Sequence, residues 1–174
     1  LEEIDRESFD KAADAIVAAR RIYIVGLRSS ASIATFLGFY FNLIFDNVVM
    51  ISANTVSEVL ESLLRVGEGD VVIGISFPRY SSRAVQAMSF ARDRGATTIA
   101  ITDSEVSPLA SIAQYTLKAR SDMASFVDSL VAPLSLVNAL LVAVSRKKNE
   151  DLSKTFETLE KIWEEYGVYE KTLE

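Results

Sequence analysis

The sequence alternates short apolar runs with segments whose apolar residues recur at helical spacing, and this alternation most constrains the fold. The runs are RIYIVG (21–26), NVVMIS (47–52), DVVIGISF (70–77), ATTIAIT (96–102) and the shorter YTLKA (115–119). Runs that are apolar at nearly every position are typical of strands covered on both faces, as in parallel sheets. Strands separated by helices then favour right-handed βαβ crossovers.

Helices are predicted between and after these strands, over residues 8–20, 31–45, 55–66, 81–95, 107–114, 128–146 and 151–166. Thr55 is the expected N-cap of one of them, and Glu58 completes a capping box. The sequence therefore predicts an α/β fold: a three-layer α/β/α sandwich with a five-stranded parallel sheet in flavodoxin-like order 2-1-3-4-5. At 174 residues, one domain is expected, with a core over about 8–148 and a C-terminal helix over about 151–166.

Composition excludes several kinds of site. The chain has no cysteine and no histidine, so disulfides and the usual zinc or iron sites are not expected, and we predict no metal and no cofactor. A net charge of −6 disfavours direct binding to nucleic acid.

The apolar stretch 129–145 is shorter than the roughly 20 residues of a membrane span and contains Pro133 and Asn138, so it is interpreted as a buried helix. The chain shows no signal peptide, which predicts a cytoplasmic location.

Two polar loops follow the first and third predicted strands, LRSS (27–30) and FPRYSS (77–82). In the order 2-1-3-4-5 these strands flank the point where the winding reverses, and ligands bind there, beyond the carboxyl ends of the strands. Both loops lead into helix N-termini, which favour anions. The candidate ligands of a phosphate monoester are Ser29, Ser30, Ser76, Ser81 and Ser82, with Arg28 and Arg79 as charged partners.

The same residues allow alternatives to an anion site. Each serine before a helix could be only an N-cap, but two such loops at neighbouring strand ends favour an anion site. A dinucleotide site is disfavoured because the first turn reads GLRSSA instead of G-x-G-x-x-G. No P-loop motif occurs either.

Three segments resemble the sugar isomerase (SIS) domain, and more closely the C-terminal effector domain of RpiR-type transcriptional regulators. They are VGLRSSASIA (25–34), GISFPRYSSRAVQAMSFARDRGATTIAITDSEVSPLA (74–110) and SFVDSLVAPLSLVNALLVAV (125–144). The resemblance implies that phosphate is held by Ser30 or Ser29 and by Ser76 and Ser81. The sequence departs from the family pattern at Arg28, where glycine is common, and at FPRY, which replaces small residues and removes a hydroxyl at Pro78.

An isomerase would need a base to move a proton between adjacent carbons. The candidates are Glu58, Asp103 and Asp128, but Glu58 fits a capping box, Asp103 fits the cap of a turn, and Asp128 fits the cap of the helix that follows. We therefore predict a non-catalytic sensor of a sugar phosphate, with Glu58 as a candidate sugar contact. The alternatives are a phosphosugar aldose–ketose isomerase or related SIS enzyme, and an interaction module with an empty pocket.

Partners are expected from both the pattern and the resemblance. The helices over 31–45 and 128–146 are apolar on nearly every side, so a second subunit should cover them, giving a homodimer or tetramer. The chain begins at Leu1, and the resemblance implies an N-terminal helix-turn-helix domain outside it. Contact with DNA is expected only through that domain, and no contact with a membrane is expected.

Overall fold

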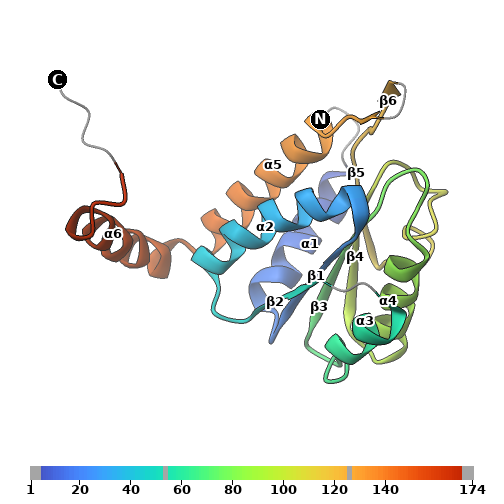
Figure 1. Cartoon of the computed structure of the whole chain (residues 1–174). Helices are drawn as coiled ribbons and strands as arrows, with labels where there is room; N and C mark the ends of the chain where they lie inside the picture. Colours follow the sequence, from blue (N-terminus) through green and yellow to red (C-terminus); the bar gives the residue numbers. More distant parts are fainter. Residues whose placement is uncertain (1–4, 53–54, 125–126, 170–174) are drawn as a thin grey trace.

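A parallel sheet with helices on both faces forms the body of the protein (Figure 1). The computed structural model describes residues 5–52, 55–124 and 127–169. The strands lie in the order β2-β1-β3-β4-β5, and every neighbouring pair is parallel. Their bounds are β1 (Ile22–Gly26), β2 (Val48–Ile51), β3 (Val71–Ile75), β4 (Thr97–Thr102) and β5 (Tyr115–Lys118). The predicted α/β architecture and strand order are confirmed.

The helices cover the two faces of the sheet in separate groups (Figure 1). One face carries α1 (Arg6–Ala18), α2 (Ala31–Ile44) and α5 (Val131–Lys147), and the other carries α3 (Val56–Ser62) and α4 (Ser82–Asp93). Strand β3 shows why both groups are needed, because all of its residues are buried. Ile73 packs toward the first group and Val72 toward the second.

Gly74 in β3 lets α4 approach the sheet closely. A Cβ atom at this position would lie 2.7 Å from Sδ of Met88, which is shorter than any ordinary contact between such atoms. The absence of a side chain at Gly74 therefore sets the distance of α4 from the sheet.

The register of the central strands brings their ends level. Ile22 of β1 pairs with Val71 of β3, and four residues later Gly26 pairs with Ile75. Both strands thus end at the same edge of the sheet, and the loops that follow them begin side by side. This is the geometry that the predicted switch point requires.

Three local predictions differ from the structure. Residues 107–114 form hydrogen-bonded turns instead of the predicted short helix, because the chain must return to the sheet at once: the Gln114 N–H donates to the Thr98 carbonyl at 2.9 Å. Residues 120–127, for which no strand is predicted, include part of an antiparallel pair, β6 (Met123–Ala124) and β7 (Val127–Asp128). Helix α5 begins at Val131, three residues later than predicted.

The last helix, α6 (Asn149–Glu165), projects away from the body beyond the end of α5 (Figure 1). Its Leu152 is buried, whereas Phe156 and Ile162 are exposed. Helices α2 and α5 also expose apolar side chains on their outer sides, with Phe39 60% and Val142 52% exposed. These helices are therefore not covered all round within one chain. None of the helices in the described part of the chain combines the length and hydropathy that crossing a membrane requires.

Candidate functional site

The first polar loop is pressed against the end of β1. After Leu27 the chain forms a single 3-10 turn over Arg28–Ser30, which runs directly into α2. A Cβ atom on Gly26 would lie 2.6 Å from Cβ of Ala34 and 2.7 Å from the Ser30 carbonyl oxygen, so only glycine fits there. The close approach buries Ser30, which is 5% exposed.

The second polar loop, residues 76–81, is closed by hydrogen bonds of its own serines. The Ser76 hydroxyl oxygen accepts from the Ser81 N–H at 3.0 Å, and the Ser81 hydroxyl oxygen accepts from the Ala84 N–H at 3.4 Å. The backbone N–H of Ser76 donates to the Ile101 carbonyl of β4 at 3.1 Å. Ser81 is therefore the N-cap of α4, as its position before the helix suggests, and Ser76 fixes the loop to it.

A tyrosine anchors the same loop to the neighbouring strand. The Tyr80 hydroxyl donates to Oδ1 of Asp103 at 2.8 Å, and the Thr102 hydroxyl donates to the same oxygen at 3.2 Å. Burial, followed by the hydrogen bond to Asp103, raises the pKa of the Tyr80 phenol above its ordinary value of 10.0. The Asp103 carboxylate is thus occupied in positioning the loop.

Both loops carry an arginine with left-handed backbone geometry. Arg28 has a φ of 59° and Arg79 a φ of 65°, and they are the only residues other than glycine with positive φ in the described part of the chain. Such a conformation is costly for a residue with a side chain and concentrates at functional sites. Neither guanidinium forms an ion pair or hydrogen bond with any described residue. Two free cations are therefore held at the tips of the two loops.

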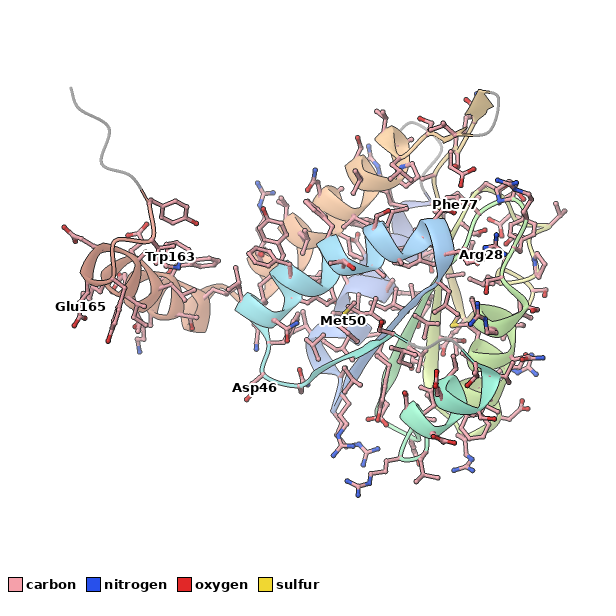
Figure 2. The ribbon with its side chains drawn as sticks, viewed as in Figure 1. Arg28, Asp46, Met50, Phe77, Trp163 and Glu165 are labelled. Atoms are coloured by element: carbon pink, nitrogen blue, oxygen red, sulfur yellow. The ribbon has the colours of Figure 1, made fainter. Side chains whose placement is uncertain are left out.

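The two loops line one pocket of about 350 Å³, which lies within the range of small-ligand sites. Figure 2 shows Arg28 and Phe77, one from each loop, at the same end of the sheet beside the start of α2. The lining residues are Leu27, Arg28, Ser29, Ser30, Ser76, Phe77, Pro78, Arg79, Ser81 and Asp128. The structure thus brings together six of the eight candidate ligand residues.

The two remaining candidates lie elsewhere. Ser82 lines a second pocket of about 560 Å³, together with Arg79, Tyr80 and Pro108. Glu58 is not among the residues that line either pocket. Its carboxylate accepts from the Thr55 N–H at 3.1 Å, which completes the predicted capping box.

Ser30 supplies an observation that capping does not explain. Its side chain makes no cap bond to α2, and no described residue hydrogen-bonds to its hydroxyl. The residue is largely buried, but its hydroxyl oxygen is not among the fully buried atoms that lack a partner, so it reaches the pocket and is available to a ligand. Hydroxyls, two guanidiniums and the N-termini of two helices suit an oxyanion such as a phosphate.

Sequence reasoning missed the place of Asp128. It was expected to cap the helix that follows, but α5 starts later, and its N-cap is Leu130, which makes no side-chain bond. Asp128 instead ends the hairpin strand β7 and lines the pocket. The short hairpin has no clear turn signal in the sequence, so only the absence of regular periodicity near residue 125 pointed to irregular structure.

Comparison with known proteins gives a consistent picture. Residues 15–143 match the SIS domain family. An uncharacterised HTH-type transcriptional regulator of Caldanaerobacter subterraneus is 29% identical over 163 residues, and one of Clostridium perfringens is 23% identical over the same length. Each alignment covers 91% of this chain, which spans 57% and 58% of the length of these relatives.

Solved structures agree with the sequence matches. The sugar isomerase domain of an RpiR transcription factor from Sphaerobacter thermophilus superposes with a TM-score of 0.87 and 30% identity, covering 92% of this chain and 89% of that one. The Vibrio vulnificus NanR protein, solved with ManNAc-6P, shares the fold with a TM-score of 0.80 at 19% identity, covering 93% of this chain and 62% of that one. The chain therefore belongs to the SIS domain family and is an RpiR-type member of it.

Proposed function

We propose that this chain is the phosphosugar-sensing effector domain of a transcriptional regulator and that it is not itself an enzyme. The observation that carries the proposal is the pocket between the two polar loops, where the Ser30 hydroxyl and the guanidiniums of Arg28 and Arg79 have no partner among the described residues. In this proposal, Ser29, Ser76 and Ser81 complete the phosphate site. Ser82 and Glu58 lie outside this pocket and would contact a ligand only if it extends beyond it.

The relatives support a regulatory role over a catalytic one. The regulators of Caldanaerobacter and Clostridium are longer than this chain, which leaves room in them for a helix-turn-helix domain. NanR belongs to the same fold and was solved with ManNAc-6P, which supports a sugar phosphate as the effector. DNA binding would then reside in a separate domain, and the site of action would be the cytoplasm.

The alternative is a phosphosugar isomerase, because putative phosphosugar isomerases share the fold at about 20% identity. Such an enzyme needs an acid and a base beside the sugar. Asp128 is the one carboxylate among the pocket-lining residues, and Asp103 already accepts two hydrogen bonds from Tyr80 and Thr102. Exchange of one isomer for another by the purified protein, abolished by Asp128→Asn, would establish the enzyme and overturn the sensor.

A second copy of the chain is part of the proposal. The outer sides of α2 and α5 expose Phe39, Tyr40 and Val142, apolar side chains that a dimer would cover. A bound phosphosugar at the N-terminus of α2 lies at one end of such an interface, so it could change the geometry of the dimer. Sedimentation at micromolar concentration should give at least a dimer, and a monomer would remove this part.

Thermal unfolding with a panel of phosphorylated sugars tests the sensor directly. A ligand at 100 times its dissociation constant should stabilise the protein by about 2.7 kcal/mol. The double variant Ser76→Ala/Ser81→Ala should lose this ligand-induced shift. The shift is measured against the variant's own ligand-free midpoint, because loss of the Ser81 cap by itself costs about 1 kcal/mol of stability. The control Ser57→Ala/Ser153→Ala removes two exposed serines outside the pocket and should keep the shift. A shift that survives in the first variant would place the site elsewhere.

A further inference from the structure

The phosphate pocket contains a carboxylate, which is unexpected for an anion site. Asp128 lines the pocket together with the serines and arginines of the two loops. A carboxylate repels a bound phosphate and so reduces affinity for the head group. Its presence in the pocket therefore suggests another role, either in the structure of the protein or in binding the rest of the ligand.

Asp128 has no evident structural role. It does not cap α5, because the N-cap of that helix is Leu130. Its backbone pairs with Met123 across the hairpin, but no described residue forms a hydrogen bond or ion pair with its carboxylate. The side chain is only partly exposed, yet both carboxylate oxygens remain available.

The free carboxylate and the two free guanidiniums line the same pocket without pairing. Asp128 forms no ion pair with Arg28 or with Arg79. Opposite charges that share a pocket without touching leave two distinct binding regions. One region suits an oxyanion, and the other suits groups that donate hydrogen bonds.

A phosphorylated sugar has this same division between a dianionic head and a body rich in hydroxyl donors. Building on the function proposed above, we propose that Asp128 is the sugar-recognition residue of the pocket. Its carboxylate accepts hydrogen bonds from hydroxyl or amino groups of the ligand while the phosphate lies on the loops of Ser30 and Ser76. The same charge disfavours a ligand with a second acidic group near the sugar end. The pocket therefore selects phosphomonoesters of neutral or amino sugars over phosphorylated sugar acids.

Calorimetric titration of Asp128→Asn separates the two regions of the pocket. The probes are inorganic phosphate, glucose 6-phosphate, fructose 6-phosphate, glucosamine 6-phosphate, ManNAc-6P and 6-phosphogluconate. Affinity for inorganic phosphate should be unchanged or higher in the variant. Affinity for the tightest of the four neutral or amino phosphosugars should fall by about tenfold or more, because a hydrogen bond to a charged acceptor is lost. Affinity for 6-phosphogluconate should rise.

Two controls keep the result interpretable. Asp122→Asn makes the same change of charge at an exposed residue just before the hairpin, and Asp122 does not line the pocket. This variant should bind every probe as the unmodified protein does. Asp128→Ala should repeat the loss seen with Asp128→Asn, and unchanged unfolding midpoints without ligand should show that both variants fold.

Each failure has a distinct meaning. If the unmodified protein binds phosphosugars and both Asp128 variants bind them within twofold of it, Asp128 does not recognise the sugar. If the variants lose affinity for inorganic phosphate and for phosphosugars to the same extent, Asp128 only shapes the pocket, and the proposal is also wrong. If the unmodified protein binds neither phosphate nor any phosphosugar, the proposed function itself fails.

Discussion

Replacing Arg79 with glycine should separate the stability of the 76–81 loop from its affinity for phosphate. Arg79 has a φ of 65°, a region that costs an ordinary residue about 1–2 kcal/mol. Glycine removes that cost but adds about 0.5–1 kcal/mol of backbone entropy to the unfolded state. The free energy of unfolding should therefore stay the same or rise by up to about 1.5 kcal/mol, and each 1 kcal/mol corresponds to roughly 2–4 °C in a protein of this size.

Affinity should move in the opposite direction. The guanidinium has no protein partner, so a bound phosphate is its expected partner, and a hydrogen bond of this charged type contributes about 1.5–3 kcal/mol. Losing it should weaken binding by about 10-fold to 150-fold. Arg79→Ala is the matched control, because it loses the same guanidinium but keeps a Cβ atom in the left-handed region. It should weaken binding equally without any gain in stability.

Urea unfolding and calorimetric titration with the best phosphosugar measure the two effects. A glycine variant that is clearly less stable and binds ligand as well as the unmodified protein would refute the reasoning. Arg79 would then owe its conformation to packing of the loop. The same pair of substitutions at Arg28, where φ is 59°, provides an independent repeat in the first loop.

Three further substitutions, the last with an exposed control, test the supports of the site and of the fold. Gly26→Ala places a Cβ atom 2.7 Å from the Ser30 carbonyl oxygen, so it should cost about 1–3 kcal/mol in urea unfolding and weaken phosphosugar binding in titration. Tyr80→Phe should cost about 1 kcal/mol at pH 8 by losing the bond to Asp103. Because the pKa of Tyr80 is raised in the folded protein, the phenol contributes to stability below about pH 10, and this contribution is lost as the pH rises through the raised pKa. The phenylalanine variant should therefore lose less stability than the unmodified protein between pH 8 and pH 11. Arg20→Met leaves the fully buried Asp70 carboxylate with the Gly67 N–H as its remaining donor and should cost about 2–3 kcal/mol in urea unfolding. Lys11→Met breaks an exposed ion pair and should leave the free energy of unfolding nearly unchanged.

Much of the architecture was predictable because it follows from burial. Strands such as β3 are covered on both faces, and that requirement appears in the sequence as an unbroken apolar run. Parallel strands require crossovers of fixed hand, so the strand order and the meeting of the two polar loops followed with few alternatives. The serines were candidates because two hydroxyl-bearing loops follow neighbouring strand ends, although each serine taken alone could be only an N-cap.

The missed features depend on contacts that local sequence does not encode. Arginine has no preference for left-handed backbone, so nothing in the sequence marked Arg28 or Arg79 as strained. Residues 107–114 have helical spacing, but Gln114 is drawn back to Thr98 at the edge of the sheet before a helix can form. Asp128 was expected as a helix cap because local rules favour aspartate there, and the hairpin that carries it into the pocket has no strong turn signal.

A crystal structure of the protein with its tightest phosphosugar tests the central claim most directly. We expect the phosphate oxygens to lie within hydrogen-bond distance of the Ser30 hydroxyl and of the loop that joins Ser76 to Ser81, with at least one of the two left-handed arginines in contact. A phosphate bound outside the pocket shared by these two loops, with the Ser30 hydroxyl still without a partner, would contradict the account.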